Sequence, residues 1–86
     1  MIEVEQKRGN WVSVQGLSYE GSAKIFPKPS KFGISGGRVS KLSLRNEGGE
    51  TVFNYDRAHD VHRIDPEDLN EIISRLESFA QNDLEI

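Results

Sequence analysis

Residues Gly33-Ile34-Ser35-Gly36-Gly37 match the G-x-S-x-G pattern that presents a nucleophilic serine in one large group of hydrolases. Carboxylates and imidazoles follow in the order that those enzymes use, at Asp56 or Asp60 and at His59 or His62. In such a triad the imidazole takes the proton of the serine, and the carboxylate orients the imidazole. Nucleophilic catalysis is therefore the first chemistry to weigh.

The surroundings of the glycine cluster favour a structural role. A catalytic elbow joins a strand to a helix, whereas two prolines precede this cluster and an alternating strand pattern follows it. An anion-binding nest beside Arg38 is a second alternative, but the Walker pattern is missing. We predict no catalytic residue. Instead, Gly36 and Gly37 are expected to supply positive backbone torsions for a bend into the next strand, with Phe32 and Ile34 pinning the loop to the core.

The segment from Asp56 to His62 contains two carboxylates and two imidazoles, which are ligand types for transition metals. In an extended segment, Asp60 and His62 point to one side and His59 points to the other. One metal ion would then not gather them all without a turn. We predict no metal site and no cofactor, and we keep a pH-dependent role of the two histidines at a partner surface as an alternative.

A helix over residues 66–81 is the clearest element. Asp65 is placed to accept backbone N–H bonds, Pro66 occupies the first helical position, and Ile64 and Leu69 fit a hydrophobic staple. Apolar residues follow at helical spacing: Leu69, Ile72, Ile73, Leu76, Phe79 and Ala80. Residues 82–86 are predicted to be a frayed tail.

Alternation with period two precedes the helix and predicts four strands, at residues 11–17, 19–26, 39–45 and 51–55. Ile2 and Val4 offer a fifth, at an edge. A glycine-containing loop over residues 46–50 predicts a hairpin between the last two strands. We expect a single domain over residues 1–86 with an α+β fold, in which an antiparallel sheet of four to five strands packs one face on the C-terminal helix.

Composition narrows the classes of function. The chain has 86 residues and no cysteine, which excludes thiolate zinc sites, thiol nucleophiles and disulfides. No apolar run approaches the roughly 18 residues that span a bilayer, so we expect a cytoplasmic protein without membrane contact, as a monomer or weak homodimer. The net charge is −3, with the basic residues concentrated in residues 1–45 and the acidic ones in residues 46–86. Two electrical ends are expected if these halves stay apart in space.

Basic residues alternate with aromatic ones along the first half, which is typical of sheets on which nucleic-acid bases stack. The residues concerned are Lys24, Lys28, Lys31, Arg38, Lys41 and Arg45 with Trp11, Tyr19, Phe26 and Phe32. The familiar aromatic signature of sheet-type RNA binders is absent, and the acidic balance of the whole chain opposes strong phosphate attraction. A small RNA- or DNA-binding module is therefore the alternative function.

Two strings, Phe32-Gly33-Ile34-Ser35-Gly36-Gly37-Arg38 and Asn54-Tyr55-Asp56-Arg57, are the most specific part of a resemblance that covers roughly residues 11–80. The chain resembles a small domain family of unknown function that occurs in bacterial phages, prophages and other mobile elements. The resemblance implies no activity. By analogy it implies a context in which small proteins block host machinery, as anti-CRISPR and other anti-defence proteins do.

We therefore expect a non-enzymatic protein that binds and inhibits a host protein or ribonucleoprotein in the bacterial cytoplasm. Two surfaces are candidates for this contact. The acidic surface consists of Glu47, Glu50, Asp56, Asp60, Glu67, Asp68, Glu71 and Glu77 and would compete with phosphate for a positively charged groove. The loop surface consists of Lys28, Lys31, Phe32, Arg38 and Arg57, with Asn54, Tyr55 and Asp56 as hydrogen-bonding anchors.

Overall fold

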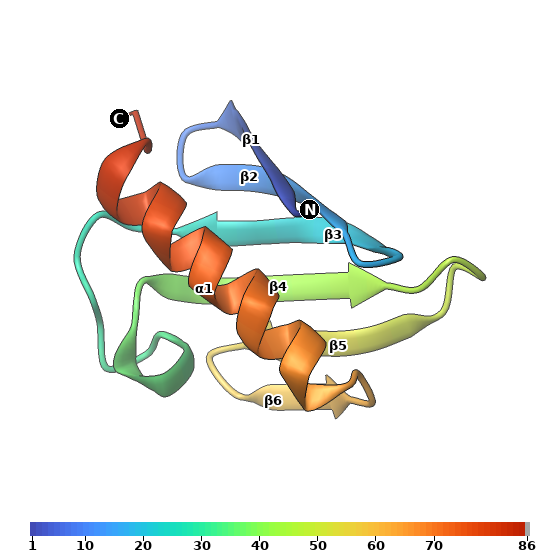
Figure 1. Cartoon of the computed structure of the whole chain (residues 1–86). Coiled ribbons are helices and arrows are strands. Elements are labelled where there is room, and N and C mark those ends of the chain that lie inside the picture. The colour runs from blue at the N-terminus through green and yellow to red at the C-terminus, as the bar shows by residue number, and fades with distance from the viewer. Residues whose placement is uncertain (86) are drawn as a thin grey trace.

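The computed structural model describes residues 1–85 and contains a six-stranded antiparallel sheet with one helix across one face (Figure 1). The strands are β1 (Glu3–Arg8), β2 (Trp11–Gly16), β3 (Tyr19–Ile25), β4 (Val39–Arg45), β5 (Thr51–Asp56) and β6 (His59–His62), and the helix is α1 (Pro66–Asn82). The strands lie in the sheet in chain order, so each pairs with the next. The predicted α+β architecture with a C-terminal helix on an antiparallel sheet is confirmed.

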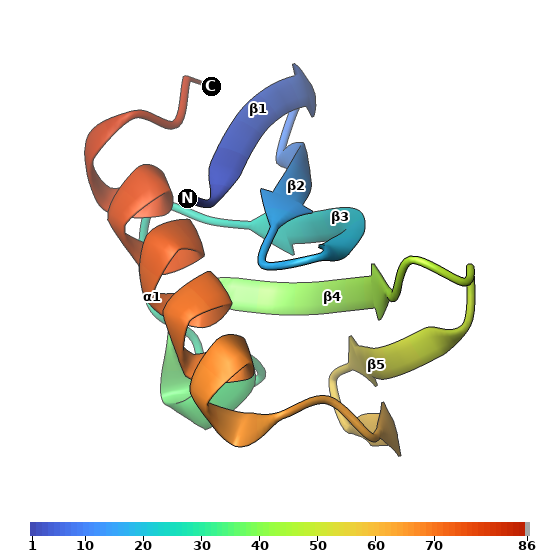
Figure 2. The same cartoon turned by 45° about the vertical axis from the view of Figure 1, so that its right-hand side comes forward.

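The helix runs diagonally over the sheet, and no described element covers the other side, which we call the open face (Figures 1 and 2). Strand alternation decides which side chains lie on which face. Val12, Val14, Leu42 and Leu44 point toward α1 and are at most 2% exposed. Their neighbours along the strands, including Ser13 and Ser43, lie on the open face.

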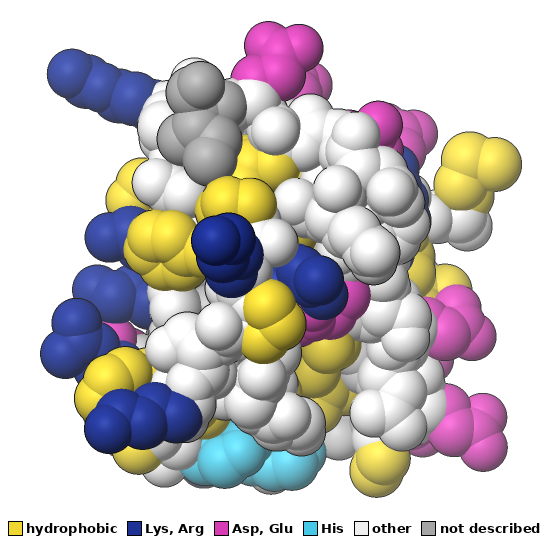
Figure 3. Space-filling model, turned by 90° about the vertical axis from the view of Figure 1, so that its left-hand side faces the viewer, with side chains coloured by type: hydrophobic (Ala, Val, Ile, Leu, Met, Phe, Trp, Pro, Cys, Tyr) yellow, Lys and Arg dark blue, Asp and Glu magenta, His cyan; other side chains and the backbone are white. Residues whose placement is uncertain are grey.

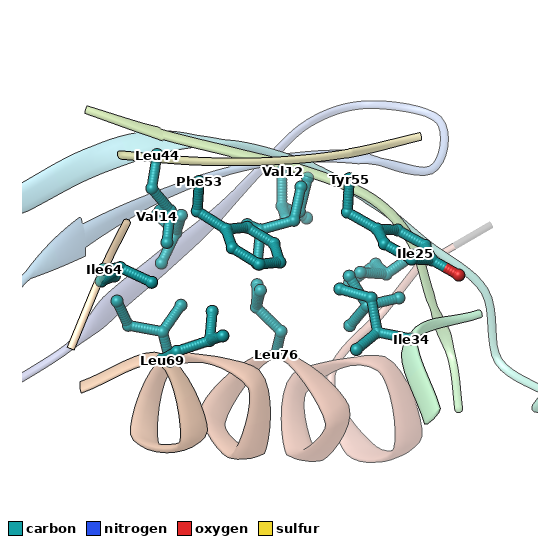
Figure 4. Close-up of a cluster of buried hydrophobic side chains, with 14 of the residues drawn as sticks. Val12, Val14, Ile25, Ile34, Leu44, Phe53, Tyr55, Ile64, Leu69 and Leu76 are labelled. Atoms are coloured by element: carbon teal, nitrogen blue, oxygen red, sulfur yellow. The ribbon is translucent and has the colours of Figure 1, made fainter. Parts of the chain in front are cut away.

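The core lies between the sheet and α1, as Figure 4 shows. Phe53 of β5 is fully buried at its centre, and Leu76 of α1 is buried on the facing side. The predicted apolar stripe forms the packed face of the helix, with Leu69, Ile72, Leu76, Phe79 and Ala80 buried. Burial of each such large side chain contributes about 1.5–3 kcal/mol, so this single layer holds the sheet and the helix together.

The sixth strand was not predicted from the sequence, and the expected number of four to five strands is wrong. β6 contains only one apolar residue, Val61, so it carries no alternating pattern. It is held by backbone pairing with β5, in which His62 faces Phe53 and His59 faces Tyr55. Asp60 is an extra residue in this ladder, and such a bulge changes the alternation of faces.

Because of this bulge, His59 and His62 lie on the same side of β6 rather than on opposite sides as predicted. Their rings stack with centroids 5.3 Å apart and planes at 16°. Both rings meet the edge of Phe53, at 5.7 and 5.3 Å between centroids. The two histidines therefore extend the aromatic side of the core to the edge of the sheet.

The start of α1 agrees with the sequence prediction. The Asp65 carboxylate accepts hydrogen bonds from the backbone N–H groups of Glu67 (2.8 Å) and Asp68 (3.4 Å), and Ile64 and Leu69 are buried together in the core. After Asn82, Leu84 is partly buried against the core and the Glu85 N–H donates to the side chain of Gln6. The last residue of the predicted frayed tail, Ile86, lies outside the described residues. Within residues 1–85 no helix has the length and apolar character needed to cross a membrane.

Candidate functional site

The antiparallel order collects the cations at one end of the sheet. The β1–β2, β3–β4 and β5–β6 connections all lie at the end where β1, β3 and β5 finish (Figure 1). We call this the basic end and define it by Arg8, Lys24, Lys28, Lys31, Arg38, Lys41 and Arg57. Figure 3 looks onto it and shows the dark blue side chains gathered over one half of the view. These cations come from three strands and two loops, so the fold rather than the local sequence assembles them.

The opposite end carries acidic groups. We call it the acidic end and define it by Glu20, Glu47, Glu50, Asp65, Glu67, Asp68 and Glu71, which lie near the β2–β3 turn, in the β4–β5 loop and in the first turns of α1. Charge is thus separated along the strands and not between the two halves of the sequence. Glu20 of the first half lies at the acidic end, and Arg57 of the second half lies at the basic end.

The predicted acidic surface is not brought together as one patch. Glu47, Glu50, Glu67, Asp68 and Glu71 share the acidic end, whereas Asp56 and Glu77 lie at the basic end. Asp56 is 3.7 Å from the Lys41 ammonium and Glu77 is 3.3 Å from the Arg38 guanidinium, so each is paired with a cation. Asp60 accepts a hydrogen bond from the Asn54 amide at 3.2 Å.

Within the acidic end, Tyr19 joins β3 to the helix. Its hydroxyl donates a hydrogen bond to the Asp68 carboxylate at 3.0 Å. Burial raises the pKa of Tyr19 above its usual value near 10, and the Asp68 carboxylate raises it further because it favours the protonated phenol. Asp68 is therefore partly buried and joins α1 to the sheet.

The loop surface is largely assembled by the fold. Phe32 is 52% exposed, with the Lys31 ammonium 5.2 Å and the Arg57 guanidinium carbon 5.8 Å from the centre of its ring. The Tyr55 hydroxyl donates a hydrogen bond to the Phe32 carbonyl at 3.0 Å, which fixes the backbone beneath the ring. An aromatic ring flanked by two cations is thus presented outward. Lys28 is exposed in the same loop.

Arg38 has a different position from the other predicted loop residues. Its Nε donates to the Pro27 carbonyl at 3.0 Å, and its guanidinium pairs with Glu77 of α1. The Arg38 backbone N–H also donates to Glu77 at 2.6 Å, and both side chains are only about one-quarter exposed. Arg38 therefore clamps the β3–β4 loop to the helix.

The glycine cluster forms a short 3₁₀ turn, η1 (Ile34–Gly36), in the loop from β3 to β4. The predicted positive torsion is confirmed at Gly36 (φ +70°), and Ile34 is buried as expected. Gly37 has φ −95°, so the prediction for this residue is wrong; a Cβ there would overlap the Glu77 carboxylate. Phe32 does not pin the loop to the core, because its ring faces solvent. Ser35 is exposed, and the cluster leads into a strand.

One feature of the basic end concerns the alternative prediction of a nucleic-acid-binding sheet, which named Trp11, Lys24 and Lys41 within a larger set but did not place them side by side. Trp11, Lys24 and Lys41 are cross-strand neighbours on the open face, and Trp11 is 40% exposed. A shallow depression of about 240 Å³ lies beside the indole, lined on this face by Trp11, Ser22, Lys41, Ser43, Asn54 and Asp56. In the sequence, this surface was indicated by Lys41 and Ser43, which alternate along β4 with the buried Leu42 and Leu44. The pairing of Trp11 with that strand pattern required the sheet register.

The described residues do not include a group of three or more His, Cys, Asp or Glu side chains arranged to hold a metal ion. The stacked His59 and His62 rings lie in nearly parallel planes, whereas two imidazoles that share one ion must both point their nitrogens at it. The basic end instead presents exposed rings and cations around a shallow depression.

The fold and these surfaces define a class: a small α+β domain in which a six-stranded antiparallel meander packs on one C-terminal helix and leaves its other face open. The chain belongs to the family described as domain of unknown function DUF7678, which matches residues 6–78. No curated protein and no solved structure matches the chain. Membership of a family of unknown function agrees with the resemblance noted in the sequence, while the origin in mobile elements stays a prediction.

Proposed function

We propose that the protein is a non-enzymatic binding protein that docks on a macromolecular partner through the loop surface, with the Phe32 ring as the anchor. The observation that carries this proposal is the outward presentation of Phe32 between Lys31 and Arg57. Binding energy at interfaces concentrates on a few aromatic and arginine side chains, and the loop surface brings one of each together, Phe32 from the β3–β4 loop and Arg57 from the β5–β6 connection.

The way in which the loop is held supports the same proposal. The Tyr55 hydroxyl bond to Phe32, the clamp between Arg38 and Glu77, and the buried Ile34 fix the loop from three directions. A preorganised loop loses little conformational entropy on binding, so more of the contact energy appears as affinity.

The charge of the surface favours an anionic partner, because opposite charges steer association. The resemblance to proteins of mobile elements favours a host protein or ribonucleoprotein as that partner and inhibition of it as the outcome. In this proposal the protein is an anti-defence factor of the anti-CRISPR kind, acting by occupation of a surface and without turnover.

Affinity capture from a bacterial lysate tests the proposal. The tagged protein is compared with Phe32→Ala and with a control at the acidic end, Glu67→Gln/Glu71→Gln, and mass spectrometry quantifies the proteins that are retained. We expect a specific partner that is lost with Phe32→Ala and kept with the control. Retention of the partner by Phe32→Ala together with its loss from the control would overturn the proposal in favour of the acidic end.

A further inference from the structure

The open face of the sheet presents an ordered row of side chains at the basic end. Trp11 of β2 lies opposite Lys24 of β3, which lies opposite Lys41 of β4. Arg8 of β1 pairs with Trp11 from the other side. The indole is therefore bordered by a cation on each neighbouring strand.

Most cations around this row are available to a ligand. Within residues 1–85, no ion pair involves five of the seven cations of the basic end: Arg8, Lys24, Lys28, Lys31 and Arg57. Lys41 is 3.7 Å from Asp56 across the strand pair, where both side chains are at least one-third exposed. Exposed pairs of this kind contribute little, so Lys41 can exchange Asp56 for another anion.

The next row of cross-strand neighbours on the open face consists of short polar side chains. Ser13, Ser22 and Ser43 are consecutive cross-strand neighbours, followed by Asn54. Ser22, Ser43 and Asn54 of this row line the shallow depression beside the indole, so hydroxyl and amide groups lie within it. A flat ring can approach the sheet there, stack on Trp11 and meet hydrogen-bonding groups.

The two exposed large aromatic side chains of the described chain, Trp11 and Phe32, both lie at the basic end. Stacking rings within a field of cations are the features with which sheets bind single-stranded nucleic acid, because every unpaired base has a face to stack and every linkage has a charge to neutralise. A duplex hides its base faces, and an acidic polypeptide offers few rings to stack.

We propose that the basic end binds single-stranded nucleic acid, with one base stacked on Trp11 and the adjoining phosphates against Arg8, Lys24 and Lys28. The strand then continues toward the ring of Phe32. This inference rests on the proposed function, since it names the chemical class that the anionic partner presents: the nucleic acid of a ribonucleoprotein.

The negative net charge of the chain does not oppose this contact. Seven acidic groups lie at the other end of the strands, and β4 alone has seven residues, which span about 20 Å. At physiological ionic strength, interactions between exposed charges are screened beyond about 8 Å. Asp56 and Glu77 at the basic end are paired with Lys41 and Arg38, so a ligand there responds mainly to the unpaired local cations.

The single tryptophan of the chain is the probe for the test. Oligouridylate and oligothymidylate of about 12 nucleotides match the length that single-strand-binding sheets cover. We expect saturable quenching of Trp11 fluorescence, with affinity that falls steeply between about 50 and 200 mM salt. A preference between the two oligonucleotides assigns the contact to RNA or to DNA.

Matched variants locate the contact, with anisotropy of a labelled oligonucleotide as the readout. Trp11→Ala should weaken binding by about tenfold or more, because one stacked base contributes about 1–3 kcal/mol. Lys24→Gln should weaken it several-fold. Arg45→Gln removes the same charge from the open face at the far end and should leave affinity within about twofold. Circular dichroism confirms the fold of each variant.

The outcomes separate this inference from the proposed function. Absence of quenching at low salt, equal losses for Lys24→Gln and Arg45→Gln, or binding of polyglutamate in place of the oligonucleotides would each overturn the nucleic-acid contact. If lysate capture still depended on Phe32 in those cases, the proposed function would stand with a protein partner. Oligonucleotide binding unaffected by Phe32→Ala, with no captured partner, would instead support stacking on Trp11 and reject both the path toward Phe32 and docking through the loop surface.

Discussion

At the scale of single residues, positive φ angles at non-glycine residues show which turns of the chain are conformationally strained. Leu17 and Ser18 form the two-residue β2–β3 turn with φ of +54° and +71°, although turns of this type prefer asparagine and glycine. A left-handed torsion costs an L-residue about 1–2 kcal/mol. Leu17 recovers part of this by packing against the core, whereas Ser18 is not among the residues that pack there. A substitution at Ser18 that removes this strain should therefore increase the stability of the fold.

Ser18→Gly is expected to stabilise the protein by about 0.5–1 kcal/mol, because glycine adopts positive φ without the steric cost. The free energy of unfolding in urea measures the change. Ser22→Gly is the matched control, since the same substitution within β3 should destabilise by about 0.5–1 kcal/mol. Two changes of the same sign would contradict the torsional argument.

Tyr19 makes a second prediction, on pH. Its pKa is raised in the folded state, first by burial and then by Asp68, so folding favours the protonated phenol. The stabilisation is complete below the ordinary pKa near 10 and is lost as pH rises through the folded value. Absorbance titration, with Tyr19→Phe as the difference reference, should show ionisation above the ordinary range, and Asp68→Asn should lower that pKa. Titration at an ordinary pKa in both proteins would refute the coupling.

At the scale of elements, a helix or strand was predicted more accurately when more independent features of the sequence indicated it. The helix had a cap, a proline, a staple and an apolar stripe, and its predicted range of 66–81 differs from the observed one by a single residue. β6 had one apolar residue and depends on backbone pairing with β5, which no local pattern encodes. Because the register of β6 with its bulge could not be predicted, the prediction put His59 and His62 on opposite faces.

The Asp65 cap gives a prediction for the start of α1. Asp65→Ala removes the acceptor of two backbone N–H groups and should destabilise the protein by about 1 kcal/mol. Asp83→Ala is the control at the other end of the helix, where a negative charge opposes the helix dipole. This control should leave the urea midpoint unchanged or slightly raised. Equal losses at both ends would contradict a capping role.

Glu77 gives a prediction for the junction between the β3–β4 loop and α1. Glu77→Ala leaves the Arg38 N–H and guanidinium without their carboxylate and should destabilise by about 1–3 kcal/mol. Glu71→Ala, an exposed position on the same helix, should change stability by less than about 0.5 kcal/mol. Urea unfolding compares the two. A loss at Glu77 no larger than at Glu71 would mean that the loop is held by Ile34 and Tyr55 without this clamp.

At the scale of the whole molecule, the sequence indicated two electrical ends but assigned them to the wrong parts of the chain. Counting charge by sequence half ignored that an antiparallel meander brings alternate connections to the same end. The loop surface was predictable because Lys31 and Phe32 are adjacent in sequence and the string containing Arg57 was already singled out. Trp11, Lys24 and Lys41 were named in the alternative nucleic-acid prediction, but their adjacency was not predicted, because they are neighbours only through the register of three strands.

The separation of charge makes a prediction that net charge alone does not. Heparin is a polyanion without bases, so its retention of the protein reports charge placement and not stacking. Neutralising Arg8, Lys24 and Lys28 to glutamine should lower the salt at which the protein elutes from immobilised heparin. Neutralising Arg45, Arg63 and Arg75 gives the same net charge but spares the basic end, and should change elution little. Trp11→Ala should elute with the unaltered protein. Equal shifts of the elution salt for the two triple variants would mean that heparin responds to the total charge of the protein. The basic end would then not be a distinct binding surface.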